Sequence, residues 1–421
     1  MSGERRADIE RIYAAAVRRV DPAIAVASTI VRDGSDVVVE GRRYAIPETG
    51  IYAIAIGKAA AAMLAGATLA LGDSLIAAIG VAKHNPNRPM LRANIVVGAH
   101  PVPDERSLVA GRAVVEFAGT IPAGAIVFCL ISGGGSALLE ELKPGVRLED
   151  IQHVTTELLT CGATIQELNA VRARLSNLKA GGLLQLLRHV TVINAIVSDV
   201  LGDDLPAIAS GPTIPDVGDA KAESVLECYG VRAILPPASS GGSETNKVPQ
   251  SVIVANVSIA LDAAMEKATS LGYVPIILSR SVEGEARDVG AWFAETALAL
   301  RSPGDSASQS ICLLAGGETT VTVRGGGVGG RNSEAALAAA IGLIGSHGIT
   351  LGCVATDGDD GDTGAAGGIV DGTTIAPIAR AVALDALNDN DSFGFLSTMG
   401  STFAPGPTGT NVNDLMIALV E

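Results

Sequence analysis

Aromatic residues and positive charge are both scarce in this chain of 421 residues. Phe, Tyr and Trp make up 3% of it, and 30 Lys and Arg face 45 Asp and Glu, for a formal net charge of −15. An acidic surface repels phosphate backbones and anionic lipids, and few aromatic rings leave few platforms on which bases can stack. We therefore expect no nucleic acid and no membrane among the partners, and an anionic ligand would need a local site of cations or backbone amides.

Cysteine is also scarce, and long apolar runs are absent. The five cysteines include no C-x-x-C pair, and several lie in apolar, strand-like runs. This pattern favours reduced, buried thiols in a cytoplasmic protein over a disulfide frame or a zinc site. No stretch approaches the eighteen or so apolar residues of a transmembrane helix, and the first twenty residues, MSGERRADIERIYAAAVRRV, are charged throughout. We expect a cytoplasmic location.

Glycine, in contrast, is plentiful, with 50 residues. No G-X-Y period appears, which excludes collagen, and 48% hydrophobic against 18% charged residues excludes a disordered low-complexity chain. The chain should fold into more than one domain, with a core built mostly from Ala, Val, Ile and Leu.

The order of apolar and helical segments predicts an α/β fold with two domains. Several runs are apolar on both faces, as parallel strands between helices are: 51–57, 93–100, 125–133 and 190–199. Helix-forming segments lie between them. Residues 234–250 are rich in Pro, Ser and Gly and predict a linker, which places a Rossmann-like domain at 1–240 and a smaller α/β domain at 241–421. A hairpin of 311–317 with 318–323 would give the second domain a mixed sheet.

Loops that follow parallel strands are where open sheets bind ligands. Lys58 follows the strand at 51–57 and opens a helix, which would place its ammonium beside a helix N-terminus facing an anion; a solvated surface lysine is the alternative. Ser132, Gly133, Gly134, Gly135 and Ser136 follow the strand at 125–133. Consecutive glycines let backbone N–H groups converge on a phosphate or carboxylate, whereas a plain tight turn would need fewer of them.

Basic residues recur in the segment 168–184. Arg172, Arg174 and Lys179 alternate with leucines and valine at helical spacing, which predicts an amphipathic helix with at least some of these cations on its wet face. Lys179 precedes Gly181 and Gly182, so it could equally compensate the dipole at a helix C-terminus.

A carboxylate follows the strand at 190–199. Asp199 is well placed either to take a proton from an alcohol or to bind a metal ion. Further along, Gly211 and Thr213 belong to a Ser-Gly-Pro-Thr turn that is a weak signal by itself.

Two loops stand out in the second half. Glycines at 325–330 precede Arg331 at the start of a helix, an arrangement suited to clamping a phosphate; a flexible connector is the alternative. The segment 357–364 holds Asp357 and Asp360 after the strand at 349–356. It lacks the late Glu of an EF-hand, so we expect a magnesium or phosphate loop, with an acidic surface turn as the alternative.

Together these segments resemble the class II glycerate kinases, the D-glycerate 2-kinase family with a C-terminal MOFRL domain. The resemblance spans nearly the whole chain in the right order, and nine motifs carry it: Gly57-Lys58-Ala59, GAHPVPDERS (98–107), LISGGGSALL (130–139), LNAVRARLSNLKAGGL (168–183), VSDVLGDDLPAIASGPT (197–213), AGGETTVTV (315–323), GGRNSEAAL (329–337), ATDGDDG (355–361) and GPTGTNVNDL (406–415).

The resemblance implies ATP- and Mg²⁺-dependent phosphorylation of D-glycerate to 2-phosphoglycerate, in a cleft between the two domains. It makes Lys58, Asp199 and Arg331 the catalytic candidates. Asp199 would act as base or orienter for the 2-hydroxyl, and Lys58 and Arg331 would neutralise phosphoryl or carboxylate charge. The implied substrate or nucleotide contacts are Ser132, Gly133, Gly134, Gly135, Ser136, Arg172, Lys179, Gly211, Thr213, Glu318, Asn332, Thr408 and Asn411. Asp357 and Asp360 are the implied metal ligands.

Two departures from the family pattern weaken part of this assignment. Asp362 replaces a Pro and Gly364 replaces an Asp in the acidic loop, which weakens a metal or substrate role there, although Asp357 and Asp360 keep their places. Ser333 stands where the family tends to have Gln after its Gly-Gly-Arg-Asn motif. A homodimer is one option for the oligomeric state, which the sequence leaves open.

Two other functions are compatible with parts of the pattern. A hydroxypyruvate reductase would need a dinucleotide fingerprint, G-x-G-x-x-G after a strand, and none follows 51–57. A non-catalytic regulator that binds phosphosugars could use the same glycine loops, but it would have no need of Asp199 and Arg331.

Overall fold

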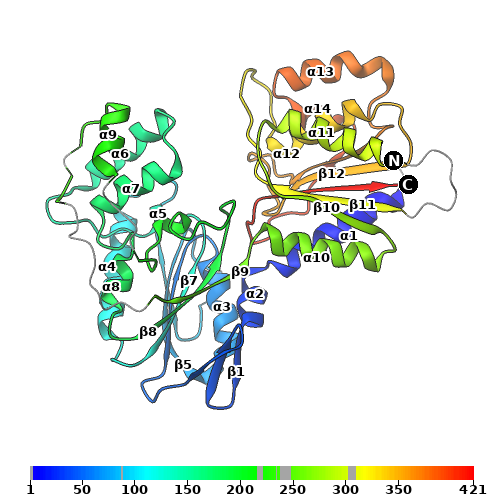
Figure 1. Cartoon of the computed structure of the whole chain (residues 1–421). Coiled ribbons are helices and arrows are strands. Elements are labelled where there is room, and N and C mark those ends of the chain that lie inside the picture. Colours follow the sequence, from blue (N-terminus) through cyan, green and yellow to red (C-terminus); the bar gives the residue numbers. More distant parts are fainter. Residues whose placement is uncertain (1–2, 87–88, 216–220, 234, 238–247, 302–309) are drawn as a thin grey trace. The chain divides into compact units, whose positions relative to one another are not determined.

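The computed structural model describes residues 3–86, 89–215, 221–233, 235–237, 248–301 and 310–421. These divide into two compact units (Figure 1). The parallel-sheet unit is Pro22–Val254, and the mixed-sheet unit joins the residues up to Asp21 to Ala255–Glu421. The structure thus differs from the predicted division at the N-terminus, where α1 (Gly3–Arg19) packs on α10 and β15 of the mixed-sheet unit. The predicted boundary itself, at 240/241, lies outside the described residues.

The parallel-sheet unit is built on six strands in the order β6-β5-β4-β7-β8-β9. From β6 to β8 all neighbours are parallel, and this is the 3-2-1-4-5-6 order of Rossmann-like sheets. The predicted α/β fold is confirmed. The strands are β4 (Ile51–Ile56), β5 (Leu75–Ala82), β6 (Ala93–Val97), β7 (Ile126–Ile131), β8 (Thr191–Val197) and β9 (Gln250–Ala255).

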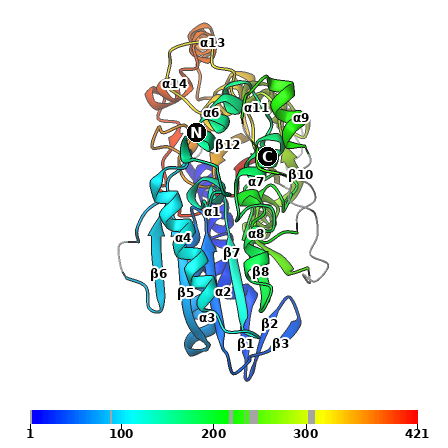
Figure 2. The same ribbon diagram turned by 90° about the vertical axis from the view of Figure 1, so that its left-hand side faces the viewer.

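Helices cover both faces of this sheet. Figure 1 shows α2 and α3 on one side and α4 and α8 on the other, and Figure 2 shows β6, β5, β7 and β8 from a second side. The side chain of Asp104 accepts the backbone N–H of Arg106 at 2.8 Å and so fixes where α4 begins. The bounds are α2 (Pro22–Thr29), α3 (Ala60–Leu71), α4 (Glu105–Thr120), α5 (Gly135–Leu138) and α8 (Gly182–Leu186).

A helical group with its own hydrophobic core completes the parallel-sheet unit. It consists of α6 (Leu148–Thr160), α7 (Ile165–Leu175) and α9 (Ala222–Tyr229), and Ile151, Val171 and Val225 are among its buried contacts. The predicted helix over 168–184 is therefore wrong in extent, since α7 ends at Leu175 and the chain turns before α8.

A small antiparallel sheet in the same unit was not predicted. It contains β1 (Ile30–Asp33), β2 (Asp36–Val39) and β3 (Arg42–Ala45). Glu40 and Gly41 both have positive φ between β2 and β3, as a two-residue hairpin turn requires. Glu-Gly between two short runs was the sequence signal for this hairpin.

The mixed-sheet unit contains six strands in the order β10-β11-β15-β12-β13-β14. The predicted mixed sheet is present, but its cause differs from the prediction. Residues 318–323 form no strand after β11, and β15, the last strand of the chain, pairs antiparallel with both β11 and β12. The strands are β10 (Val274–Val282), β11 (Ile311–Gly317), β12 (Ile349–Ala355), β13 (Gly367–Asp371), β14 (Thr402–Phe403) and β15 (Asp414–Val420).

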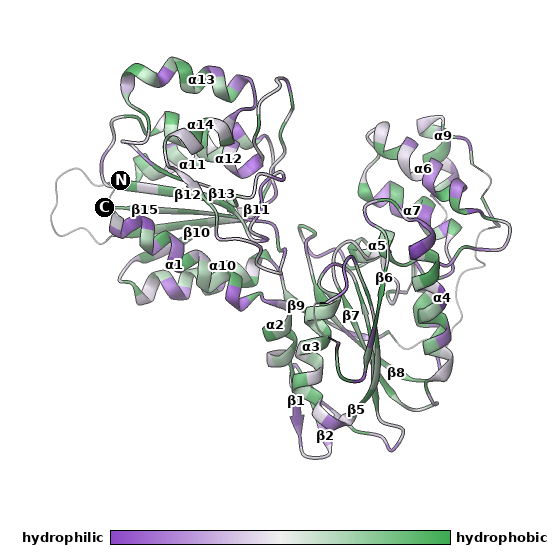
Figure 3. Ribbon diagram, turned by 180° about the vertical axis from the view of Figure 1, so that it is seen from behind, coloured by the Kyte–Doolittle hydropathy of each residue, from purple (hydrophilic) through white to green (hydrophobic). Residues whose placement is uncertain are grey.

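Helices also cover both faces of the mixed sheet. Figure 1 shows α1 and α10 on one side and α11 to α14 on the other, and Figure 3 shows the strands of both units largely in hydrophobic colours. Asn256 caps α10 through the N–H of Ile259 at 2.8 Å. The bounds are α10 (Val257–Ser270), α11 (Ala286–Ala299), α12 (Arg331–Gly342), α13 (Arg380–Asn388) and α14 (Ser392–Thr398).

The cysteines are all free, as predicted, but not all buried. Cys129, Cys312 and Cys353 lie inside strands, whereas Cys161 and Cys228 are exposed. Those two lie in the helical group, at the end of α6 and in α9, where no sheet covers them. Among the described residues, no helix is both long and apolar enough to cross a bilayer.

Candidate active site

The loops after β4 and β7 meet at the point where the strand order of the parallel sheet reverses. The backbone N–H of Lys58 donates to the carbonyl of Gly133 at 2.9 Å, and the N–H of Ala59 donates to Ser132 Oγ at 3.1 Å. Ser132 is buried, so its hydroxyl joins the two loops. Lys58 itself is exposed. Ligands bind at this kind of switch point in open α/β sheets. Lys58 and the glycine loop, both singled out from the sequence, therefore lie where such sheets bind ligands.

The glycines of the loop at 132–136 leave little room for side chains of their own. A Cβ on Gly133 would lie 1.9 Å from Asp199 Oδ2, and one on Gly134, which has φ +81°, would lie 3.1 Å from Lys58 Cε and from His100 Cδ2. Asp199, Lys58 and His100 thus converge on two successive glycines. The absence of Cβ atoms opens the backbone to these three side chains and to any ligand between them.

Arg172 lies directly behind the glycine loop. Its Nη1 donates to Ser136 Oγ at 2.8 Å and its Nε to Thr155 Oγ1 at 3.3 Å. Ser136 Oγ is also 2.7 Å from Ser210 Oγ. The expectation of cations on a wet helix face was wrong here, because Arg172 and Arg174 are only 5% and 2% exposed. Each has a partner from a distant segment, as buried charges must.

Lys179 is also buried, in an ion pair with Glu140. Its ammonium donates to Glu140 Oε2 and to the carbonyl of Leu139, and both side chains are inaccessible to solvent. Burial lowers the pKa of Lys179, and the Glu140 carboxylate opposes that shift. Lys179 is thus held by Glu140, not by a helix C-terminus, and this geometry gives it a structural role.

The turn that contains Gly211 and Thr213 has an unusual backbone. Ala209, Ser210 and Gly211 have φ of 53°, 60° and 54° in succession, a left-handed run that is costly for the two residues with a Cβ. The backbone N–H groups of Ala180 and Gly181 hold it by donating to the carbonyls of Ser210 and Gly211, at 2.9 and 2.8 Å. Thr213 is fully buried.

His100 is a site residue that the sequence reasoning did not single out, although it lies within the quoted 98–107 motif. Burial and the nearby cations Lys58, Lys83 and Arg172 lower the pKa of His100 to about 4. The imidazole is therefore neutral at neutral pH. The signal that could have found it was a histidine at the carboxyl end of a predicted parallel strand, 93–100.

In the mixed-sheet unit, Arg331 begins α12 and is held by two carboxylates. Its Nε and Nη2 contact both oxygens of Asp414, the latter at 3.1 Å, and its Nη1 donates to Glu318 at 2.8 Å. Asn332 Nδ2 donates to Asp414 at 2.9 Å. Burial raises the pKa of Asp414 to about 6, and the hydrogen bond from Arg331 works against that rise. The five-donor fork of Arg331 keeps donors for a ligand.

Of the two predicted metal ligands in the acidic loop, Asp360 has a structural role. Both oxygens of buried Asp360 accept backbone N–H groups, from Asn332 at 2.9 Å and from Ser333 at 2.7 Å, which caps α12. Asp357 is only partly buried and accepts the N–H of Asp359 at 3.1 Å. Across the part of the chain that the structure describes, no three His, Cys, Asp or Glu side chains form a group that could hold a metal ion.

Thr408 and Asn411 lie in the loop before β15, beside the acidic loop. The Thr408 hydroxyl donates to the carbonyl of Thr356 at 2.7 Å, and its N–H donates to the carbonyl of Asp357 at 3.1 Å. Asn411 Oδ1 accepts the N–H of Asn413 at 3.1 Å. The Thr408 side chain therefore ties this loop to the segment after β12, and the Asn411 side chain braces the loop itself. Their predicted ligand contacts stay predictions.

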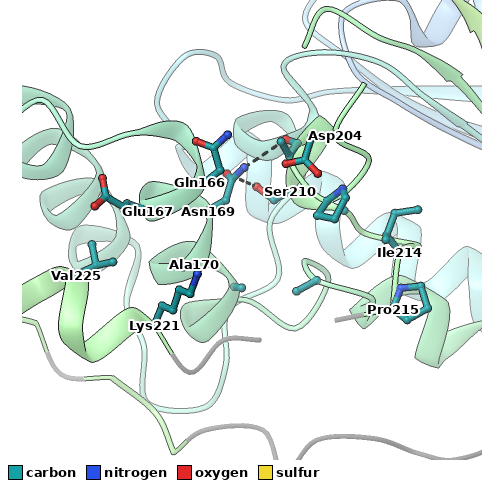
Figure 4. A pocket seen from close by; sticks show the side chains of 15 residues that line it. Gln166, Glu167, Asn169, Ala170, Asp204, Ser210, Ile214, Pro215, Lys221 and Val225 are labelled. Atoms are coloured by element: carbon teal, nitrogen blue, oxygen red, sulfur yellow. Dashed lines mark hydrogen bonds between the residues drawn. The ribbon is translucent and has the colours of Figure 1, made fainter. Parts of the chain in front are cut away.

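A cavity of about 300 Å³ opens beside α7 in the parallel-sheet unit (Figure 4). We call it the α7 cavity; residues of the segments 166–173 and 204–215 line it, with Ala180, Lys221 and Val225. Asn169 crosses it, since its Nδ2 donates to the carbonyl of Ala207 at 3.2 Å and its Oδ1 accepts from Ser210 at 2.7 Å. Ser210 thus belongs both to this cavity and to the hydrogen bonds behind the glycine loop.

The chain matches two family models and is similar to several named proteins. Residues 8–240 match the Domain of unknown function (DUF4147) and residues 311–414 match the MOFRL family. A D-glycerate 2-kinase of Thermotoga maritima is 39% identical over 378 residues, 88% of this chain and 90% of that protein. A putative hydroxypyruvate reductase of Agrobacterium vitis is 39% identical over 381 residues, 87% of this chain and 98% of that protein. The crystal structure of a glycerate kinase from Thermotoga maritima aligns with a TM-score of 0.86 at 35% identity, covering 97% of this chain and 98% of that one.

Proposed function

The chain belongs to the glycerate 2-kinase family with a C-terminal MOFRL domain, and from this premise we propose that it transfers a phosphoryl group from ATP to D-glycerate, giving 2-phosphoglycerate and ADP. It is a phosphotransferase with an alcohol as acceptor, and ATP is its co-substrate.

The observation that carries this proposal is the convergence of Lys58, His100 and Asp199 on the glycine loop. Phosphoryl transfer needs positioning and charge neutralisation more than covalent chemistry. A backbone free of Cβ atoms lets oxygens of a phosphate or carboxylate approach N–H groups closely. The cations Lys58, Lys83 and Arg172 around His100 supply positive charge at the same place, against the net charge of the chain.

Asp199 is the proton acceptor or orienter in this proposal. It lies two residues after the end of β8 and reaches the glycine loop at Gly133, so a 2-hydroxyl placed over that loop would be within reach of its carboxylate. In the kinase template an aspartate accepts the proton of the attacking hydroxyl. Because His100 is neutral, we assign the positive charge beside the transferred group to Lys58, which lies against the glycine loop.

Arg331 of the mixed-sheet unit is the second cation that we assign to the reaction. Asp414 and Glu318 fix its guanidinium while leaving donors for a planar anion. The location of the active site between the two domains stays a prediction, as do a homodimer and a cytoplasmic location.

Magnesium is part of the proposal through ATP. Both oxygens of buried Asp360 already accept backbone N–H groups, so of the predicted pair Asp357, which is the more exposed, is the ligand that we assign first. Mg²⁺ in kinases is held largely by phosphate oxygens with one or two carboxylates. When bound, it would neutralise charge on the phosphates.

The experiment that tests the function couples ADP release to D-glycerate and assigns the product by phosphorus NMR. We expect ADP formation that depends on D-glycerate and a single product, the 2-phosphate. The same preparation is given NADH and hydroxypyruvate, because relatives carry the reductase name. NADH oxidation without ADP release would replace the proposal with the reductase, and binding of phosphosugars without either reaction would favour a regulator.

The first mutational prediction concerns Lys58. Replacing it by Ala should lower kcat/KM by about 10²–10³, because a preorganised cation at the developing charge is lost. Lys267→Ala is the matched control, since Lys267 lies on α10, in the other unit. Both variants should keep the wild-type unfolding curve. A Lys58→Ala enzyme with the turnover of Lys267→Ala would refute the role of this lysine.

A further inference from the structure

The α7 cavity and the glycine loop differ sharply in charge. The cavity is lined by two carboxylates, Glu167 and Asp204, against one ammonium, Lys221. Hydrogen bonds from Thr164 and Tyr229 lower the pKa of Glu167, so this carboxylate is ionised. A phosphate or the carboxylate of glycerate would be repelled there, whereas the cations near His100 favour anions at the glycine loop. The cavity therefore suits the uncharged part of a ligand whose charged part lies at the loop.

The walls of the α7 cavity suit a flat ring. Nine of its fifteen lining residues are Ala, Pro, Gly, Ile or Val. Ala170 and Ala173 lie three positions apart on one face of α7, and Ala207 lines the cavity from the segment 204–215. Ile214 and Pro215 of the same segment are labelled in Figure 4. Small apolar walls with a few polar groups are typical of sites for heteroaromatic ligands. Gln166 supplies an amide with both a donor and an acceptor, the pair that reads the edge of adenine.

The cavity and the loop are joined by one hydroxyl. Ser210 lines the α7 cavity, and its Oγ is 2.7 Å from Ser136 Oγ at the end of the glycine loop. The left-handed run at Ala209, Ser210 and Gly211 is held in place by 180–181. Strain of this kind persists where the surrounding structure fixes a ligand-binding group. The Ser210 hydroxyl is hydrogen-bonded both to Asn169, which lines the cavity, and to Ser136 of the glycine loop, so Ser210 lies between the two.

We infer that the α7 cavity holds the adenine base of ATP, with the triphosphate passing Ser210 toward the glycine loop. This inference rests on the proposed kinase function and adds to it that the parallel-sheet unit binds the nucleotide. D-Glycerate is excluded from the cavity by the acidic lining. The base sits between the alanines of α7 and the 204–215 segment, and Gln166 reads its edge.

Filling the cavity tests this assignment. Ala173→Phe, and independently the more exposed Ala170→Phe, should raise the KM for ATP at least about tenfold and leave the KM for D-glycerate within about twofold. Adenosine alone should inhibit the wild-type enzyme in competition with ATP, and this inhibition should weaken in both variants. Ala113→Phe, on a partly buried face of α4 away from the cavity, is the matched control and should change neither constant.

Photolabelling gives a readout that does not need turnover. With 8-azido-ATP we expect wild-type peptides 166–173 or 204–215 to be labelled and excess ATP to suppress the label. Labelling confined to the mixed-sheet unit, an unchanged KM for ATP in both folded variants, or a rise in the KM for D-glycerate instead would overturn the inference. Failure of the kinase function itself would appear separately, as no ADP release by the wild-type enzyme.

Discussion

The imidazole of His100 is held neutral by its surroundings, and this can be measured. Its pKa is lowered to about 4 by burial and by Lys58, Lys83 and Arg172, while an unfolded histidine titrates near 6.5. The unfolded state therefore takes up the proton first, so this group destabilises the fold as the pH falls from about 6.5 to 4. His100→Gln should remove that part of the pH dependence and leave stability at pH 8 little changed.

Urea denaturation at several pH values, with NMR titration of the imidazole, checks the prediction for His100. His153→Gln, at an exposed position of α6, is the control and should leave the pH dependence as in the wild type. An imidazole that titrates at the ordinary value in the folded enzyme would show that neither burial nor the cations lower its pKa.

Asp414 predicts a second pH effect, at Arg331. Its pKa is raised to about 6 by burial, so the carboxyl ionises as the pH rises through 6 and only then pairs fully with the guanidinium. We expect kcat/KM to rise across this pH range because Arg331 becomes fixed. For stability the sign is opposite: the folded state prefers the protonated acid, so this group contributes less to stability above pH 6 than below about 4.

Asp414→Asn should abolish the rise of kcat/KM near pH 6, because an amide does not titrate there. It should also lower the plateau of kcat/KM, because the amide carries no negative charge to pair with Arg331. Glu318→Gln is the matched control, because Glu318 contacts the same guanidinium from a more exposed position. A pH–rate profile decides between them. Persistence of the rise in Asp414→Asn would assign it to another group.

At the scale of elements, the sequence predicted the parallel strands because each is an apolar run that ends at Gly, Ser or Asp. It could not predict that α7 stops at Leu175 with its arginines inside. Arg172 donates a hydrogen bond to Ser136. Arg174 forms an ion pair with Glu223 and donates to the carbonyl of Pro236. These partners come from segments far from α7 in the sequence. The periodicity of a helix indicates only which of its sides is polar. It does not indicate whether partners from distant segments bury that side.

The two buried arginines of α7 offer a matched pair for the glycine loop. Arg172→Lys should lower kcat/KM about tenfold, because lysine cannot keep the bonds to Ser136 and Thr155 together. Arg174→Lys should leave kcat/KM near the wild-type value, since its partners Glu223 and Pro236 lie outside the loop. A pure stability effect would lower the unfolding midpoint of both variants and change the kcat of neither; that result would refute a positioning role for Arg172.

At the scale of the whole molecule, the two units are not consecutive stretches of sequence, because the N-terminal residues belong to the same unit as the C-terminal part of the chain. The first helix, α1, buries Ile9, Ile12 and Tyr13, and its contacts are with α10, β12 and β15 of the mixed-sheet unit. Tyr13 donates to the carbonyl of Ala355 and Tyr273 donates to Asp8, both at 2.9 Å. A linear reading of domains assigns α1 to its neighbours in sequence, and amphipathic periodicity predicts a buried face without saying what buries it.

The contacts of α1 predict which elements a destabilising substitution in this helix will affect. Ile12→Ala leaves a cavity at a fully buried position and should cost about 2–5 kcal/mol. Because the contacts belong to the mixed-sheet unit, amide hydrogen exchange should accelerate in α10, β12 and β15 and stay unchanged in β4, β7 and β8. Ile24→Ala, on the exposed side of α2 at 44% exposure, should cost less than about 0.5 kcal/mol. Faster exchange in the parallel sheet of Ile12→Ala would mean that α1 stabilises the unit that follows it in sequence instead.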